Sequence, residues 1–242
     1  MKLWLLCATC LLSSGMAFSW PEDEAAQPKL WELTPSLAYS RTAYKHGDIE
    51  RQLLGLAFER SMDVLGGLSL AGEFGYAFKT RHDAMARQTE WAKWNGEGSG
   101  YVVGGETKLA PFRNLSGLKG WARLHYWSEH YGDRDFVPSS TDADAFGLIL
   151  GALYDVALTP SFGLRAGVEL VVFEDGSFDP RVGNNTIDVV GDKIVEKDVK
   201  RDNPFGLRVG GVYETKENGL RIKADVVFLS ELSVRLGVGF PF

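Results

Sequence analysis

The residues best suited to chemistry in this chain are carboxylates that stand beside a histidine or beside one another. Glu129 directly precedes His130, and a carboxylate that orients a histidine can make it a general base that activates water. Further acidic pairs are separated by a single residue, namely Asp133 with Asp135 and Asp142 with Asp144. Adjacent residues of a strand point to opposite faces, so a strand would separate Glu129 from His130.

Nucleophilic chemistry has one candidate in the stretch "LHYWSEH". A hydrolase needs its serine and its histidine within hydrogen-bond reach of each other. His125 and Ser128 have opposite parity in the sequence, so a strand would turn them to opposite faces as well. We therefore predict that the protein is not an enzyme and assign no catalytic residue, with a hydrolytic site as the least favoured alternative.

Metal and cofactor binding are not favoured either. The acidic stretches "YGDRD", "STDADA" and "FEDGSFD" supply oxygen ligands that suit hard divalent cations. None of them forms a full coordination pattern, and solvated loops explain them better. The chain has no glycine-rich phosphate loop and no Cys/His cluster, and its net charge of −6 argues against nucleic acid as a partner. We predict no metal, no cofactor and no nucleic acid.

The elements that carry these residues are expected to be strands. In "LRIKADVVF", apolar residues occupy one parity while Arg221, Lys223 and Asp225 occupy the other. This alternation gives a strand one apolar and one polar face, whereas a helical period would spread the charges around every side. Segments with this character cover residues 30–44, 49–61, 67–80, 99–111, 117–131, 145–158, 162–175, 204–216, 219–229 and 231–242.

The connections between these segments fall into two kinds. Short turns such as "TPS" and "KENG" follow the second, fourth, sixth and eighth segments. Long polar loops follow the third, fifth and seventh, and the last of these contains a possible hairpin with its turn at Gly191–Asp192. Long loops at one end and tight turns at the other are typical of a transmembrane β-barrel that runs up and down.

The N-terminal residues predict a secretory signal peptide over 1–19. Lys2 precedes a short apolar run and a small-residue region, with cleavage after Ala17 or Ser19. Both cysteines, Cys7 and Cys10, would leave with it. Residues 20–29 are predicted to be a short disordered lead and 30–242 a single barrel domain. Beyond the signal no uninterrupted apolar run reaches about 18 residues, the length that a transmembrane helix needs.

The C-terminal stretch "VRLGVGFPF" resembles the ending of bacterial outer-membrane β-barrel proteins. Arg235, Gly237, Phe240 and Phe242 match the pattern polar–x–Gly–x–x–aromatic–x–aromatic, which the outer-membrane assembly machinery recognises in that class. The resemblance is to the porin and small outer-membrane-protein class and to no single functional family. It implies an all-β, antiparallel up-and-down transmembrane β-barrel of about ten strands, with eight or twelve as alternatives.

The same resemblance implies a place in the cell and a set of partners. The protein is expected in the outer membrane of a Gram-negative bacterium, exported through the periplasm. Its partners would be outer-membrane lipid, lipopolysaccharide and, during biogenesis, the assembly machinery. Ten-stranded outer-membrane barrels include the omptin proteases, but none of the acidic pairs reproduces the omptin spacing. A rim-active hydrolase therefore stays the least favoured function.

If the parity of Phe242 faces lipid, the opposite parity forms the lumen. The two signs of charge then balance inside, which favours a lumen plugged by paired charges over an ion-selective pore. A narrow porin-like channel for small hydrophilic solutes is the alternative. The predicted lumen charges are Glu32, Arg51, Glu59, Glu73, Lys79, Glu106, Lys108, Arg123, Glu129, Asp155, Arg165, Glu169, Arg208, Glu214, Arg221, Lys223, Asp225 and Arg235.

The long loops are the expected site of function. We predict that a rigid barrel displays them for a structural or surface-interaction role with an unknown ligand. Trp91 and Trp94 lie in the first long loop and are a possible surface contact, although such rings also favour the lipid interface. Aromatic residues expected near the strand ends at the short turns are Trp31, Phe112, Trp121, Phe240 and Phe242.

Overall fold

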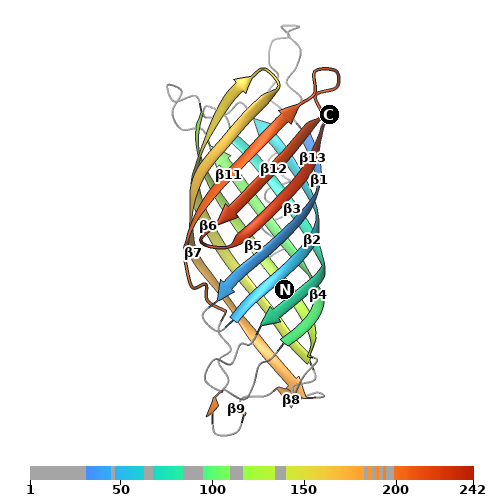
Figure 1. Cartoon of the computed structure of the whole chain (residues 1–242), viewed down its shortest axis with the longest axis vertical. Helices are drawn as coiled ribbons and strands as arrows, with labels where there is room; N and C mark the ends of the chain where they lie inside the picture. Colours follow the sequence, from blue (N-terminus) through green and yellow to red (C-terminus); the bar gives the residue numbers. More distant parts are fainter. Residues whose placement is uncertain are drawn as a thin grey trace, which may run out of the picture.

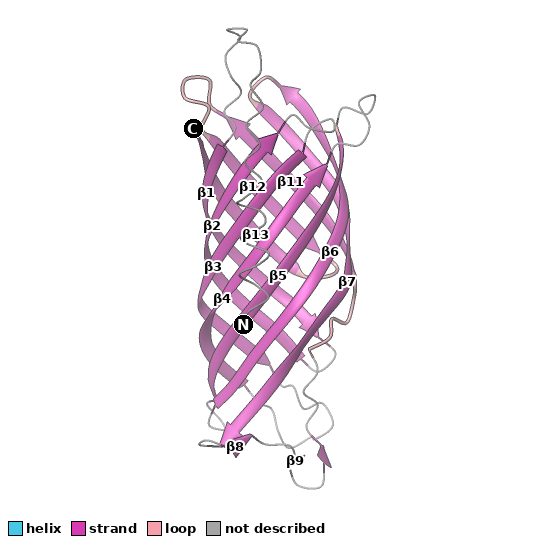
Figure 2. Cartoon of the chain, turned by 180° about the vertical axis from the view of Figure 1, so that it is seen from behind, coloured by secondary structure: helices cyan, strands magenta, loops and turns pink. Residues whose placement is uncertain are grey.

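The structure is a computed structural model of the whole chain, and it is all-β. It describes residues 31–44, 47–62, 68–83, 95–109, 117–133, 140–182, 185–186, 189–190, 193–194 and 199–242. Figure 2 shows only strands and loops in this part of the chain. Within the described residues, no helix is long and apolar enough to cross a membrane.

Ten long strands form the barrel. Each strand pairs in an antiparallel manner with its neighbour in the chain, and the pairs β1–β13 and β7–β11 complete the closed circuit (Figure 1). The prediction of a ten-stranded up-and-down barrel is confirmed. The strands are β1 (Trp31–Tyr44), β2 (Gly47–Met62), β3 (Leu68–Asp83), β4 (Asn95–Leu109), β5 (Leu118–Asp133), β6 (Ser140–Thr159), β7 (Phe162–Val182), β11 (Phe205–Glu214), β12 (Arg221–Phe228) and β13 (Leu232–Pro241).

The remaining strands belong to the connection between β7 and β11. β8 (Asn185–Thr186) pairs in an antiparallel manner with the end of β7, while β9 (Val189–Val190) and β10 (Lys193–Ile194) pair with each other. This pair agrees with the hairpin that the sequence predicted, and its expected turn residues lie outside the described part. β7 itself is longer than predicted, since it continues to Val182.

The two ends of the barrel differ, and they are called here the turn end and the loop end. The turn end carries the connections 160–161 and 215–220 together with Phe242; the loop end carries the connection from β7 to β11. In Figure 1 the turn end is at the top and β8 and β9 are at the bottom. Gly219 takes a left-handed φ of 68° in the turn 215–220, a conformation that glycine adopts without steric cost.

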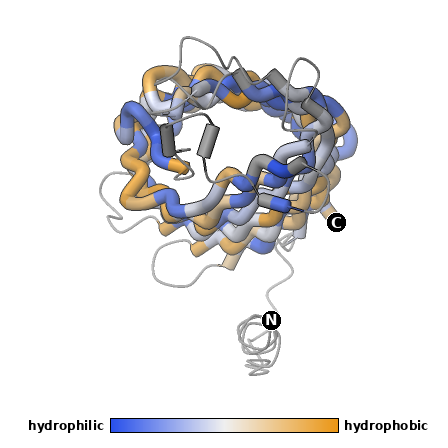
Figure 3. Tube along the Cα trace, turned by 90° about the horizontal axis from the view of Figure 1, so that it is seen from below, coloured by the Kyte–Doolittle hydropathy of each residue, from blue (hydrophilic) through white to orange (hydrophobic). Residues whose placement is uncertain are grey.

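Alternation along each strand sorts the side chains between the two faces of the wall. Figure 3 looks along the barrel and shows hydrophobic and hydrophilic residues alternating around the ring. On β12, Ile222 is half-exposed on the outside, whereas Arg221 and Lys223 bond to Glu32 of β1 on the inside. The outer face is therefore apolar and the inner face polar, as the strand pattern requires.

Two register shifts change this alternation near the loop end. In β3 one extra residue lies between Ala77 and Thr80, and in β7 Val172 has no partner opposite β6. A β-bulge of this kind lets two successive residues face the same side. Phe78 and Lys79 consequently both face outward, as do Val172 and Phe173. The prediction that Lys79 lies in the lumen is wrong, because parity was carried through a bulge that the sequence does not reveal.

Candidate functional site in the barrel lumen

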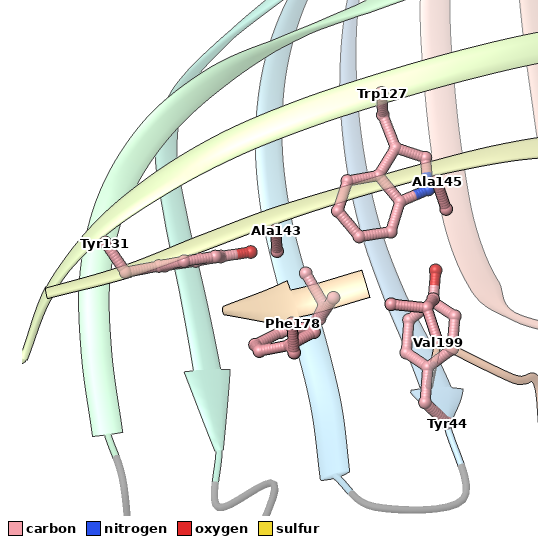
Figure 4. Packing of buried hydrophobic residues seen from close by; sticks show 8 residues of the cluster. Tyr44, Trp127, Tyr131, Ala143, Ala145, Phe178 and Val199 are labelled. Atoms are coloured by element: carbon pink, nitrogen blue, oxygen red, sulfur yellow. The ribbon is translucent and has the colours of Figure 1, made fainter. Parts of the chain in front are cut away.

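A cluster of buried side chains lies inside the barrel near the loop end, and it is called here the loop-end core. Its members come from five barrel strands and from the segment 199–204, which precedes β11. They are at most 2% exposed, and Figure 4 shows seven of them labelled, with the rings of Tyr131 and Phe178 stacked. The loop-end core comprises Tyr44, Ile49, Trp127, Tyr131, Ala143, Ala145, Phe178 and Val199.

A buried ion pair lies beside this core. Arg51 Nε donates to Glu129 Oε1 at 2.6 Å, and the two side chains are 7% and 0% exposed. Tyr131 donates its hydroxyl to the same carboxylate, and the Arg51 guanidinium lies 4.4 Å from the ring centre of Trp127. A buried pair persists only where further contacts satisfy both groups, and here the hydroxyl and the indole ring do so.

A second buried carboxylate gathers several donors. Glu174 accepts from Trp127 Nε1 at 3.1 Å and from the Tyr44 hydroxyl at 3.3 Å, while His125 Nε2 lies 3.3 Å away. Arg201 of the segment 199–204 forms an ion pair with it. Glu174 reaches the interior only because of the bulge at Val172, so parity reasoning missed it.

Arg201 also reaches the β12–β13 hairpin. Its Nη1 lies 3.4 Å from Glu231 Oε2, and the same oxygen accepts from Thr42 Oγ1 at 3.3 Å. Burial alone would raise the pKa of Glu231, but Arg201 and Arg123 hold that pKa below its usual value. Burial would lower the pKa of Arg201, yet Glu174 and Glu231 raise it. Both groups, which lie outside the strands, therefore keep their charge in the interior.

In the middle of the lumen the buried polar side chains have fewer hydrogen-bond partners. Arg123 and Arg235 share the carboxylate of Glu73, the latter at 3.0 Å. Arg208 lies 5.4 Å from the ring centre of Trp121. Among the described residues, buried Nε atoms of Arg123 and Arg208 have no hydrogen-bond partner. Buried polar groups are normally paired, so we expect ordered water at this level.

The lumen near the turn end holds a cavity of about 910 Å³. Charged side chains of both signs line it, and they pair with one another across neighbouring strands. Lys119 and Arg165 both contact Asp155, at 2.9 and 3.0 Å, and Arg221 contacts Glu214 at 2.9 Å. These side chains are partly exposed, in contrast to the buried pairs of the loop end.

The outer wall explains where such a barrel can reside. Large apolar side chains, among them Leu54, Phe74 and Leu236, are about half exposed around the outside. At the turn end the ring of Trp31 stacks on that of Phe58, with 4.7 Å between the ring centres, as expected of an aromatic girdle. A continuous apolar outer face and a charged inner face in a closed barrel suit a bilayer and not water. The chain has the fold of a bacterial outer-membrane β-barrel.

Comparison with known proteins adds resemblances at low sequence identity. No protein-family model and no curated protein sequence matches the chain. The translocator domain of the autotransporter NalP from Neisseria meningitidis is similar over 89% of this chain and 90% of that one, with 9% identity and a TM-score of 0.49. The β domain of the Bordetella autotransporter BrkA is similar over 88% of this chain and 100% of that one, with 13% identity and a TM-score of 0.49. Neisserial surface protein A is similar over 88% of this chain and 97% of that one, with 13% identity and a TM-score of 0.36.

The structure places most of the predicted lumen charges of this outer-membrane barrel on the inner face. Glu59 and Glu106 both contact Lys108, and Asp225 lies 3.7 and 3.8 Å from Arg165 and Arg208. Glu169 instead accepts a hydrogen bond from Ser230 at 2.8 Å. Lys79 lies on the outer face, as described above. Lys119, Glu174, Arg201 and Glu231 are interior charges that sequence reasoning did not include.

The residues of the C-terminal pattern divide between the faces. Arg235 points inward, Gly237 is buried against the side chain of Thr34, and Phe240 and Phe242 are exposed on the outside. Trp121, expected among the outer aromatic residues, is buried inside the outer-membrane barrel because its parity is inward. Trp91, Trp94 and Phe112 lie outside the described residues.

Two of the candidate catalytic pairs, Glu129 with His130 and His125 with Ser128, lie on opposite faces of β5, and Asp135 lies outside the described residues. Glu129 points inward, while His130 lies on the outer surface with its Nδ1 2.5 Å from Asp142 Oδ1. His125 is buried inside, whereas Ser128 belongs to the opposite face of β5. Within the described residues, no group of three His, Cys, Asp or Glu side chains could hold a metal ion.

Proposed function

We propose that this protein is an integral outer-membrane barrel with a closed lumen that displays polar loops outside the cell. The loop end would face the exterior and the turn end the periplasm. The observation that supports this best is the loop-end core, in which Tyr44, Tyr131 and Phe178 are at most 1% exposed. Side chains buried this deeply favour a packed interior over a column of water at this level.

The role we propose is structural or interactive and not enzymatic. A closed, hydrogen-bonded barrel with a filled loop end is a rigid support for the connections that leave it. Export through the periplasm, the barrel assembly machinery and lipopolysaccharide belong to the same proposal. The apolar outer wall supports them because it needs a lipid environment. No cofactor and no nucleic acid enter this function.

A narrow channel for small hydrophilic solutes is the second candidate. It is favoured by the cavity of about 910 Å³ near the turn end and by the charged residues that line it. The cavity supplies a wide polar entrance from one side. A channel would further need a polar path through the loop-end core, where the buried groups are tightly paired.

Conductance in planar lipid bilayers separates the two candidates. Protein that migrates differently on a gel before and after heating is folded as a barrel, and only such protein should be used. We expect no stepwise conductance from the folded wild-type chain. Regular steps from the wild type, repeated across preparations and lost on heating, would refute the closed lumen and favour the channel.

A further inference from the structure

Three strands stop short of the loop end and leave an opening in the wall there. β13 pairs with β1 only as far as Arg41, and β11 pairs with β7 only as far as Leu170. Residues 42–44 of β1 and 171–180 of β7 continue beyond that level. The segment 199–204, called here the closing segment, lies between them.

Backbone contacts tie the closing segment to both sides of this opening. On the β7 side, Val171 N donates to Pro204 O at 2.8 Å and Val199 N to Gly176 O at 3.3 Å. On the β1 side, Asp202 N donates to Ala43 O at 3.1 Å, next to an isolated bridge between Tyr44 and Arg201. The segment thus replaces a strand in the wall, but with a far shorter ladder than the eight or more pairs that join the barrel strands of this region.

Arg201 fastens this short ladder from the inside. Its side chain is 7% exposed and lies between Glu174 of β7 and Glu231 of the β12–β13 hairpin. Leu229 of that hairpin has a φ of 84°, a strained conformation for leucine. One buried guanidinium therefore joins the closing segment, β7 and the hairpin.

The interior beneath this closure is polar, and a cavity opens into the lumen at the opposite end. The turn-end cavity reaches inward along the strands, and the unpartnered buried atoms of Arg123 and Arg208 continue a polar layer above it. The loop-end core lies between this layer and the loop end. Val199 belongs to that core, so the core is complete only while the closing segment is in place.

We propose that the closing segment is a gate fastened by Arg201, and that its release gives the barrel a cation-selective conductance. The proposal rests on the closed lumen proposed above as the resting state. When Arg201 leaves, Glu174 and Glu231 lose their shared partner and line the opened mouth. Carboxylates at a constriction favour the passage of cations, so inorganic monovalent cations are the conducted species.

The decisive variant is Arg201→Ala, with Arg41→Ala as its matched control. Arg41 also pairs with acidic residues, Asp48 at 2.6 Å and Glu50 at 3.6 Å, but it lies exposed on the outer face. In planar bilayers under a KCl gradient, R201A should give stepwise currents whose reversal potential shifts toward that of potassium. Wild type and R41A should stay silent. Replacing Glu174 and Glu231 by glutamine in R201A should remove the selectivity and leave the conductance.

A reversible lock tests the movement itself. Asp202 and Ala43 lie opposite each other and are exposed, and cross-strand neighbours at this spacing suit a disulfide. In A43C/D202C/R201A the oxidised protein should be silent, and reduction in the same membrane should start the steps. If R201A does not fold, R201K takes its place. Lysine keeps the positive charge but lacks the planar guanidinium group that reaches both carboxylates.

The outcomes separate this proposal from the closed resting state. Steps from unmodified wild type refute the closed lumen. Silence of folded R201A and R201K, or steps that persist in the oxidised triple variant, overturns the gate and leaves the closed lumen intact. Conductance without preference for potassium over chloride overturns the cation selectivity.

Discussion

The two halves of the barrel interior arise from the same alternating strands, yet they are built differently. At the loop end apolar and aromatic inward residues pack beside buried polar ones, and the charges among them, such as Arg51 and Glu129, are buried in pairs. At the turn end charged and partly exposed inward residues are arranged around a cavity. Alternation decides which residues face inward, but the size and polarity of those residues decide whether the lumen becomes a core or a water-filled mouth.

This difference teaches where the stability of the barrel should be concentrated. An exposed ion pair is worth about 0–1 kcal/mol, whereas removing one partner of a buried pair costs about 3–5 kcal/mol. Large buried aromatic side chains add a packing contribution that a cavity lined by solvent lacks. Substitutions of similar chemistry should therefore have unequal effects in the two halves.

The largest effect is expected from Arg51→Ala. It leaves Glu129 buried without its cation, and the barrel should lose about 3–5 kcal/mol of unfolding free energy. Urea unfolding of the protein in lipid vesicles, followed by tryptophan fluorescence, measures the loss. The double variant R51A/E129A should recover part of it because no unpaired charge remains. A loss below about 1 kcal/mol for R51A would show that the loop end is as wet as the turn end.

Phe178→Ala should come next. Phe178 is 1% exposed and packs between Tyr131 and His82, so truncation leaves a cavity and costs about 3 kcal/mol. Phe162, which is exposed on the outer face of the same strand near the turn end, supplies the control. Phe162→Ala should cost clearly less in the same unfolding assay. Equal costs at both positions would contradict a packed core at the loop end.

Acidification should loosen the loop end through Glu231. Its pKa lies below the usual 4.5 because Arg201 and Arg123 outweigh the opposing effects of burial and Glu174. A carboxyl with a lowered pKa stabilises the fold above pH 4.5, and this contribution is lost as the pH falls toward the lowered value. The protection factors of the Val199 and Asp202 amides, which anchor the closing segment, that is, their hydrogen exchange corrected for the intrinsic pH dependence, should therefore fall as the pH drops below 4.5.

A variant identifies the titrating group in that experiment. Glu231→Gln should give faster exchange at neutral pH and a smaller change on acidification. Exchange at the turn end, for instance of the Thr215 amide that bonds to Leu220 O, should not follow the same pH dependence. If the protection factors at both ends fall together in wild type and in E231Q, the charge of Glu231 does not hold the loop end.

The sequence predicted the turn half better than the loop half, for a physical reason. Alternation persists through most of the turn half, apart from a register shift between Ala157 and Thr159 beside the turn 160–161, so parity assigned Glu32, Asp155 and Arg221 to the inner face. Bulges in β3 and β7 interrupt it near the loop end, which moved Lys79 outward and Glu174 inward. A bulge depends on pairing between strands, and one strand's pattern does not encode it. Arg201 lies in a loop, where periodicity carries no information.

The smallest effect is expected from Lys119→Ala at the turn end. Its side chain is 40% exposed and 2.9 Å from Asp155, which keeps Arg165 as a second partner at 3.0 Å. Solvent and Arg165 both stabilise the charge of the Asp155 carboxylate. The loss of unfolding free energy should therefore stay below about 1 kcal/mol and shrink in high salt. A matched loop-end measurement is the double-mutant cycle of Arg51 and Glu129. Comparable coupling energies in the two pairs would contradict the proposed contrast, whereas weak coupling at Lys119 and strong coupling at Arg51 would place the rigid part of the lumen at the loop end.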